Sequence, residues 1–290
     1  MPLLFPYQDK DSRIHRMDAR PKIAFVLAIF MLSILISDIF YLAVFLAFAM
    51  LVVMMAKVLR ATLSLLKYTV YVAAFLFLFS ILFSQGSTVI FTIWIIQVTQ
   101  ESILFATSMS LRLFLAIVAF SVLTFTVHPD DLLKILSRFG VKSMTVLSIA
   151  TRMYPTIAAD SGNIEDAMKA RGVEFDKGNF IAKAKARAPV MMPLLLNSMD
   201  RSMEVAEAME ARGFGARRRT SYYDPVISRR EKAIMYLALA ALPFGLAMFI
   251  LSYGNANYLA GSTLTVSSTD ILVVAVELLL FTPILLGAKK

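Results

Sequence analysis

The sequence predicts an all-α, multi-span membrane protein with six transmembrane helices and three further helices in the cytoplasm. Of its 290 residues, 59% are hydrophobic, whereas soluble proteins contain about 45–50% apolar residues. Only 17% of the residues are charged, and long apolar stretches contain none of them. Composition and clustering together assign the chain to the membrane class.

Several kinds of chemistry are excluded by the residues that the chain lacks. It has no cysteine, which rules out disulfides and thiolate catalysis, and its only histidines are His15 and His128. No paired carboxylates and no metal-ligand spacing stand out. The stretch 140–143 (Gly-Val-Lys-Ser) has its lysine one place late for a phosphate-binding loop. We therefore expect no catalytic residue, no cofactor and no metal site.

The predicted spans are apolar runs that approach the roughly 20 residues a membrane-crossing helix needs. The first run is short unless Lys22 snorkels to the interface. The apolar run Val89–Val98 is too short to cross, so we expect it to be interfacial or re-entrant. The six predicted spans are Ile23–Ile36, Ile39–Ala56, Tyr68–Phe83, Ser102–Val127, Ala233–Leu251 and Ile271–Leu286.

The positive charges predict the orientation in the cell membrane. A net charge of +9 could indicate a nucleic-acid partner, but in a membrane protein the usual cause is the excess of Lys and Arg in cytoplasmic loops. The three predicted outer loops contain no Lys or Arg. We therefore expect no nucleic-acid partner and both termini in the cytoplasm. The predicted regions are a cytoplasmic N-terminal segment (1–22), spans 1–4 (23–127), a cytoplasmic helical region (128–232) and spans 5–6 (233–290).

Two charged residues fall within predicted spans. Arg112 lies in the fourth span and Glu277 in the sixth, each some way in from the outer face. An unpaired arginine at mid-membrane costs about 2.5–3.5 kcal/mol. We predict that the two side chains pair and tie the fourth span to the sixth. The alternative is a proton or ion relay.

The cytoplasmic region is much longer than a connecting loop. An Asp-rich start predicts a short capped helix, and two longer helices follow. Prolines within the longer helices are expected to bend or interrupt them. The predicted helices run from Pro129 to Gly140, from Val141 to Arg171 with a bend or break near Pro155, and from Asn179 to Arg212 with interruptions near Pro189 and Pro193.

The two longer helices end in the same element, Ala-Met-x-Ala-Arg-Gly, at 167–172 and 208–213. A glycine after the last turn closes a helix, and an arginine there faces the negative end of the helix dipole. Two ordinary C-caps would explain each element alone. Identity at five of six positions, 41 residues apart, favours two equivalent docking sites. The predicted docking residues are Ala170, Arg171, Gly172, Ala211, Arg212 and Gly213.

An apolar stripe and a basic run complete the region. Met192, Leu195, Met199 and Met203 recur at three- and four-residue steps, which predicts one helix face. Methionines adapt to several shapes, so this face suits a partner that repacks; plain packing against the other helix or the membrane is the alternative. The run Arg217-Arg218-Arg219 is interpreted as a lipid-headgroup and topology signal.

Four motifs in this sequence resemble those of the transmembrane coupling (T) component of energy-coupling-factor ABC transporters, the EcfT/CbiQ family. The stretch 12–22 is similar to the family's Ser, His, Leu-Asp-Pro-Arg and Lys stretch, with Ala19 in place of the usual proline. Residues 126–133 resemble its Thr-x-x-Pro-Glu-x-Leu motif, and Arg-Met-Tyr-Pro at 152–155 resembles its Arg-Phe-x-Pro. The paired Ala-Arg-Gly elements match in order and spacing.

The resemblance implies a non-catalytic subunit of an ATP-driven importer. Its Ala-Arg-Gly ends would contact two ABC ATPase subunits, with Arg171 and Arg212 pairing with acids there. The coupling helices would also hold a substrate-binding integral membrane subunit, for uptake of a vitamin or a cobalt or nickel ion. The alternative function is a stand-alone proton-coupled carrier or membrane enzyme that uses Arg112 and Glu277.

Overall fold

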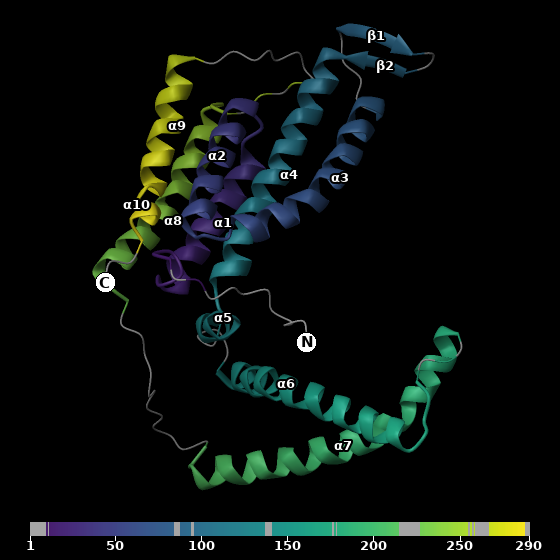
Figure 1. Cartoon of the computed structure of the whole chain (residues 1–290). Coiled ribbons are helices and arrows are strands. Elements are labelled where there is room, and N and C mark those ends of the chain that lie inside the picture. Colours follow the sequence, from purple (N-terminus) through teal and green to yellow (C-terminus); the bar gives the residue numbers. More distant parts are fainter. Residues whose placement is uncertain are drawn as a thin grey trace. The chain divides into compact units, whose positions relative to one another are not determined.

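The computed structural model (Figure 1) describes residues 10, 12–83, 88–93, 96–136, 141–175, 177, 179–214, 227–254, 256, 258 and 267–287. The chain divides into two units. Unit 1 comprises Met1–Leu132 and Val226–Lys290, and unit 2 comprises Leu133–Pro225.

Helices account for nearly all of the described part of unit 1. Among the described residues, four stretches are long and apolar enough to cross a membrane: Leu59–Phe83, Gln100–Thr126, Arg229–Ile250 and Ser268–Leu285. The apolar α2 is shorter, at 17 residues, so the count of six spans stays a prediction. The helices of unit 1 are α1 (Ala19–Leu35), α2 (Ile39–Met55), α3 (Leu59–Phe83), α4 (Gln100–Thr126), α8 (Arg229–Ile250), α9 (Ser268–Phe281) and α10 (Pro283–Leu286).

The helices of unit 1 pack around an aromatic and aliphatic core. Helix α1 packs against α4 and α8, while α3 lies along α4 (Figure 1). Phe25 of α1 meets Phe281 of α9 edge-on, with ring centroids 5.5 Å apart. Between α3 and α4, the buried hydroxyls of Thr62 and Ser121 are 3.1 Å apart. Helix α3 leaves most of its other apolar side chains exposed, as expected of a helix that faces lipid.

Side-chain caps determine where the first two helices begin. The carboxylate of Asp18 accepts a hydrogen bond from the Arg20 amide at 3.0 Å, and that of Asp38 accepts one from the Phe40 amide at 2.8 Å. Such caps satisfy amides that have no partner within the helix. Because α1 begins at Ala19 rather than at the predicted Ile23, Lys22 lies in its first turn.

A β-hairpin is the exception to the predicted all-α fold. Strands β1 (Val89–Ile93) and β2 (Ile96–Thr99) pair antiparallel, with Val89 opposite Thr99 and Ile93 opposite Ile96. The segment is rich in valine, isoleucine and threonine, which favour strands. The Thr88 amide donates to both carboxylate oxygens of Glu101, at 3.1 and 3.3 Å, and so joins the hairpin to α4. The sequence places an interfacial or re-entrant segment here without specifying strands.

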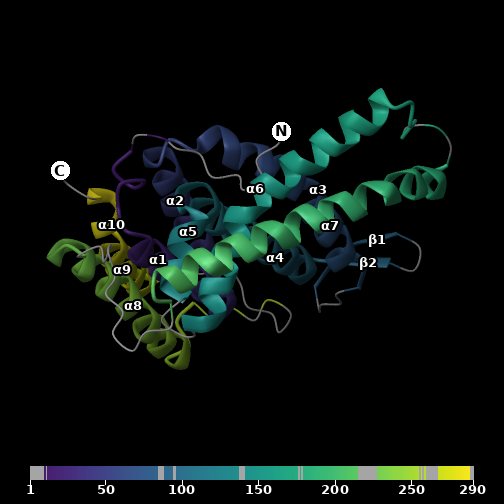
Figure 2. The ribbon, with the colours of Figure 1, turned by 90° about the horizontal axis from the view of Figure 1, so that it is seen from below.

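Unit 2 contains two long helices that lie side by side (Figures 1 and 2). These are α6 (Val141–Ala170) and α7 (Phe180–Ala211), and α5 (Pro129–Leu136) precedes them. Ion pairs link α6 to α7: Arg187 to Glu165 at 3.4 Å and Arg201 to Asp160 at 3.2 Å. Residues 137–140, where the sequence ends the first helix, lie outside the described residues.

The predicted interruptions near Pro189 and Pro193 are wrong, and the helix that contains Pro155 is not broken there. Pro155 lies within α6, and Pro189 and Pro193 lie within α7, and both helices continue through them. A proline removes one backbone donor from the helix ladder. In α7 both prolines are at least partly exposed, so water can satisfy the carbonyl groups left without that donor.

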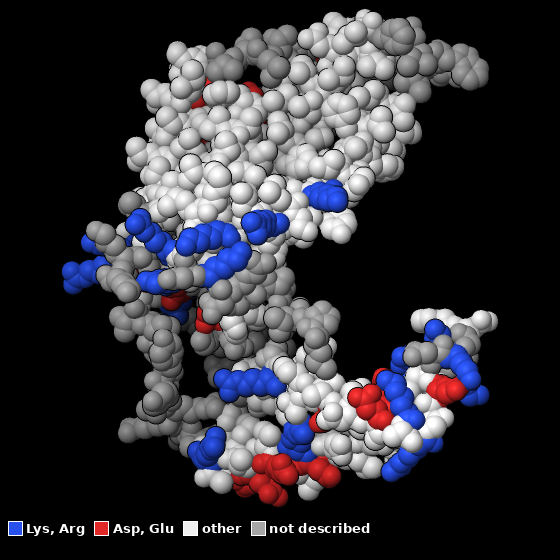
Figure 3. Space-filling model, viewed as in Figure 1, with Lys and Arg blue, Asp and Glu red and all other residues white. Residues whose placement is uncertain are grey.

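Charged residues are distributed unevenly over unit 1. On the face shown in Figure 3, basic side chains form a band at one end of its helices, and the body beyond the band is almost free of charge. This is the pattern expected where one end of a helical bundle meets the cytoplasmic headgroups.

Candidate partner-docking sites

The first candidate site is the pair of helix ends that carry the repeated element. At the end of α6 the Gly172 amide donates to Lys169 O at 2.9 Å, and the Val173 amide donates to Met168 O at 3.1 Å. At the end of α7 the equivalent bonds, Gly213 to Glu210 at 2.8 Å and Phe214 to Met209 at 2.9 Å, recur. This pair of bonds defines a Schellman motif. The two helix ends therefore share one backbone geometry as well as one sequence.

Both glycines are required by conformation rather than by space. Gly172 has φ of +89° and Gly213 has φ of +68°, in the left-handed region that other residues rarely adopt. A Cβ built at either position meets no atom of the described residues within 4 Å. The helix ends are therefore open, with room for another molecule to approach.

Arg171 and Arg212 are the C-cap residues of these two motifs. Both are exposed, and within the described part of the chain neither guanidinium forms an ion pair. The structure thus presents two exposed cations on two helix ends of the same backbone form. An exposed cation with no partner in its own chain is available to an acidic group on another molecule.

The methionine stripe on α7 is exposed. Met192, Leu195, Met199 and Met203 are 64%, 54%, 61% and 63% exposed. Leu195, Met199 and Met203 also line a shallow hollow of about 320 Å³, together with Ser198 and Ser202. Among the described residues, packing against α6 therefore does not account for the stripe. Unlike α3, this helix carries many charged residues beside its apolar face.

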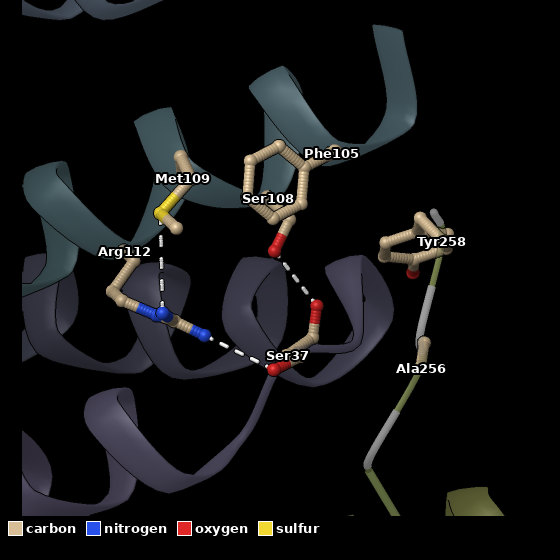
Figure 4. A pocket seen from close by; sticks show the side chains of 7 residues that line it. All are labelled: Ser37, Phe105, Ser108, Met109, Arg112, Ala256 and Tyr258. Atoms are coloured by element: carbon tan, nitrogen blue, oxygen red, sulfur yellow. Dashed lines mark hydrogen bonds between the residues drawn. The ribbon is translucent and has the colours of Figure 1, made fainter. Parts of the chain in front are cut away.

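The predicted ion pair between Arg112 and Glu277 is not formed. Arg112 instead donates from Nη2 to Ile36 O at 3.1 Å and to Ser37 Oγ at 3.1 Å (Figure 4). Ile36 and Ser37 belong to the turn between α1 and α2, so the guanidinium lies level with that turn. The sequence did not identify these partners, because nothing in the spacing of an arginine shows which loop it faces.

Glu277 occupies a separate buried position. Its side chain is 1% exposed, and its Oε2 atom has no hydrogen-bond partner within the described residues. It lies next to Gly245 of α8, where a Cβ would come within 3.1 Å of Glu277 Oε1 and would clash with Leu32 Cδ2. Arg112 and Glu277 therefore contact different parts of unit 1, and a proton or ion relay that passes directly from one to the other is not supported.

A junction at one end of unit 1 was not predicted. Lys22 is 2% exposed, and its Nζ donates to Thr126 O at 2.9 Å and to His15 O at 3.1 Å. The Asp18 amide donates to Glu231 Oε1, at 3.1 Å. Lys22 therefore turns inward rather than snorkelling to the interface, which was the condition for a longer first span. The junction connects the N-terminal turn with the end of α4 and the start of α8.

Within the described residues, no group of three or more histidine, aspartate or glutamate side chains is placed to hold a metal ion.

Comparison with known proteins places these features in a family. Residues 10–222 match the family described as CbiQ, cobalt transport protein. The energy-coupling factor transporter transmembrane protein EcfT of Lactococcus lactis subsp. cremoris (strain MG1363) is 35% identical over 239 residues, which are 76% of this chain and 87% of that protein. The protein of the same name from Streptococcus thermophilus (strain ATCC BAA-250 / LMG 18311) is 32% identical over 254 residues, covering 83% of this chain and 95% of the relative.

Proposed function

The chain belongs to the CbiQ family, together with the EcfT transmembrane proteins of energy-coupling factor transporters, and from this membership we propose a coupling role. In this proposal the chain is a non-catalytic subunit in the cell membrane, with both termini in the cytoplasm. It transmits ATP hydrolysis from two partner ATPase subunits to a separate substrate-binding membrane subunit. The cargo is a micronutrient, either a vitamin or a cobalt or nickel ion, and the substrate-binding subunit selects it.

The observation that carries the proposal is the pair of equivalent helix ends. Each ends in a Schellman motif with an exposed arginine at the C-cap, Arg171 in one and Arg212 in the other. Two equivalent ends suit two equivalent partners, as a pair of ATPase subunits would be. A helix end is also rigid, so that movement of a partner moves the whole helix rather than a side chain.

Charge complementarity supplies the expected binding energy. An exposed ion pair contributes at most about 1 kcal/mol, because water screens it. Truncating one partner of a charge pair that is buried at an interface costs about 2–5 kcal/mol. We infer that each arginine meets a carboxylate of an ATPase subunit in a site from which water is excluded.

The apolar stripe of α7 supports contact with the other partner. Met192, Leu195, Met199 and Met203 present flexible apolar side chains on a charged helix. Such a surface can remain in contact while the partner changes its orientation, because methionine repacks at low cost. We propose that it contacts the substrate-binding membrane subunit.

Reversal of both charges tests the coupling role. The double variant Arg171→Glu, Arg212→Glu should lose the ATPase subunits during purification of the complex and should abolish ATP-driven uptake. The reason is that a carboxylate placed opposite the partner's acids turns attraction into repulsion. Co-purification followed by mass spectrometry of the bound subunits measures the first effect.

A matched control changes the same number of charges elsewhere in unit 2. Lys177 and Lys185 are exposed and lie outside the two capped ends, so Lys177→Glu with Lys185→Glu should retain the ATPases. Retention of the ATPases by the Arg171→Glu, Arg212→Glu protein, or equal loss from the control, would refute docking through these helix ends.

A further inference from the structure

A polar pocket in unit 1 is not used by the proposed coupling role. It has a volume of about 230 Å³ and lies between α4, the turn after α1 and a segment that precedes α9 (Figure 4). Helix α4 contributes a cation and an aromatic ring, and the other two segments close the opposite side. The lining residues include Ser37, Phe105, Ser108, Arg112, Ala256 and Tyr258.

The cation in this pocket has only neutral partners among the described residues. Arg112 Nη2 donates to Ile36 O and Ser37 Oγ, and Nη1 lies 3.9 Å from the weakly accepting sulfur of Met109. The Nε atom is buried and has no hydrogen-bond partner within the part of the chain that the structure describes. No carboxylate of the described chain forms an ion pair with Arg112. A guanidinium has five N–H donors, so this side chain has both charge and donors to spare.

The remaining polar groups are already occupied. Ser108 Oγ donates to Ser37 O at 2.8 Å, and the Tyr258 hydroxyl accepts a hydrogen bond from the Ile39 amide at 3.1 Å. Phe105 and Ala256 add apolar walls. A single free cation beside apolar walls favours a ligand that has one anionic group and an apolar or uncharged remainder.

The position of the pocket favours phosphate as that anionic group. Arg112 lies midway along α4, and its guanidinium is held by the turn between α1 and α2, which the predicted orientation puts on the outer side of the membrane. Phospholipids of the outer leaflet present their phosphates on this side of the membrane, and a guanidinium binds phosphate through paired N–H donors. We propose that the pocket binds a phosphate group, and that an outer-leaflet phospholipid headgroup supplies it.

Binding to the lipid-depleted full-length chain in detergent tests the proposal. One arm adds dioleoylphosphatidylglycerol and counts bound molecules by native mass spectrometry. The other arm adds inorganic phosphate and follows binding by calorimetry. We expect one saturable phosphatidylglycerol per chain, and we expect Arg112→Gln to weaken its binding by about tenfold or more, since a charged hydrogen-bond partner is lost. Arg112→Lys should restore part of the affinity.

A second variant separates binding from folding. Ala256→Phe fills the pocket but leaves Arg112 and its contacts on the α1–α2 turn in place, and it should weaken binding as much as Arg112→Gln does. Arg60→Gln removes an exposed cation of α3 as the matched control and should bind like the unaltered chain.

The two arms also identify the source of the phosphate. Phosphatidylglycerol binding that depends on both Arg112 and Ala256, with no matching effect for inorganic phosphate, assigns the pocket to lipid. If instead inorganic phosphate binds in a way that depends on both residues and phosphatidylglycerol does not, the phosphate site stands but its source is not lipid. Binding that is unchanged in either Arg112→Gln or Ala256→Phe overturns the site itself.

Discussion

Lys22 shows how one buried side chain can organise the end of a helical unit. Its ammonium group finds two backbone carbonyls, of Thr126 and His15. Thr126 is the last residue of α4, where the chain leaves the bundle, and Glu231 beside Asp18 lies in the first turn of α8, where it returns. The N-terminal turn is therefore connected to both points.

We predict that Lys22→Met destabilises the protein by about 1–3 kcal/mol, because the Thr126 and His15 carbonyls lose their shared donor. The measurement is the thermal unfolding midpoint of the purified chain in detergent. Lys67→Met removes an exposed lysine and should leave the midpoint within the error of the wild-type value. Equal midpoints for Lys22→Met and the wild type would show that the buried bonds contribute nothing to stability.

Asp38 gives a prediction with a definite pH dependence. Burial raises the pKa of Asp38 in the folded protein, although the hydrogen bond from the Phe40 amide opposes this shift. A raised folded-state pKa means that the native state holds the proton more tightly than the unfolded state. The contribution of Asp38 to stability is therefore full below its pKa in the unfolded chain, about 3.9. This contribution is lost as the pH rises through the pKa of Asp38 in the folded protein.

Asp38→Asn should therefore raise the thermal unfolding midpoint at about pH 7.5. Asparagine keeps the acceptor that caps α2 but carries no buried charge. The gain should shrink towards pH 4, near the carboxyl's ordinary pKa. Unfolding midpoints of both proteins at the two pH values provide the comparison. A midpoint difference that does not change with pH would contradict the role assigned to burial.

Features that depend on a short stretch of sequence were predictable, whereas contacts between distant parts of the chain were not. The Ala-Arg-Gly ends were readable because a Schellman cap depends on six consecutive residues, Met168 to Val173 in α6. The predicted ion pair between Arg112 and Glu277 was wrong. The sequence indicates how far along its helix each residue lies, but not towards which neighbouring element its side chain points. Ser37 and Ile36, the actual partners of Arg112, lie on a turn about 75 residues earlier in the chain.

At the scale of elements, helix identity was predicted better than helix limits. The sequence places span 3 at Tyr68–Phe83, whereas α3 begins at Leu59, because a hydropathy criterion discards the polar first turns of a helix that continues out of the apolar layer. The hairpin β1–β2 was not specified, since a ten-residue apolar run suits a buried helix, a re-entrant segment or two short strands equally well.

The stripe of α7 yields a prediction about partner contact. Met199→Glu places a charge in the centre of the apolar face and should remove the substrate-binding membrane subunit from the purified complex, while the helix itself persists. The physical reason is the cost of burying an unpaired carboxylate at the interface. Quantitative mass spectrometry of the co-purified subunits and circular dichroism of the variant give the two readouts.

Asn197→Glu is the matched control for this stripe. Asn197 is exposed on the same helix and lies roughly 160° around its axis from Met199, so the same charge should have little effect there. If the Met199→Glu protein keeps the substrate-binding subunit, or if both variants lose it equally, the stripe is not the contact surface.

The whole molecule divides into an apolar unit and a charged helical pair. That contrast was visible in the sequence because composition alone separates them. The number of crossings was less accessible: α1 and α2 have 17 residues each, about 26 Å of helix, against a hydrocarbon core of about 30 Å. Whether such helices cross depends on tilt and on local bilayer thickness, and neither is encoded in the pattern of one chain.

We propose that the two helix ends of unit 2 dock two ATPase subunits. The chain contains no cysteine, so a single introduced cysteine is the only thiol of this subunit that reacts with a cross-linker. Lys169 and Glu210 occupy equivalent places in the two motifs, one residue before Ala-Arg-Gly, and both are exposed. Lys169→Cys and Glu210→Cys, each labelled with a photoactivated cross-linker in membranes that contain the assembled transporter, provide the most direct measurement.

Both cysteines should give an adduct with an ATPase subunit, and a cysteine at Lys67, on α3 of unit 1, should give none. An adduct from only one of the two helix ends, or from neither, would show that the two ends are not equivalent docking sites.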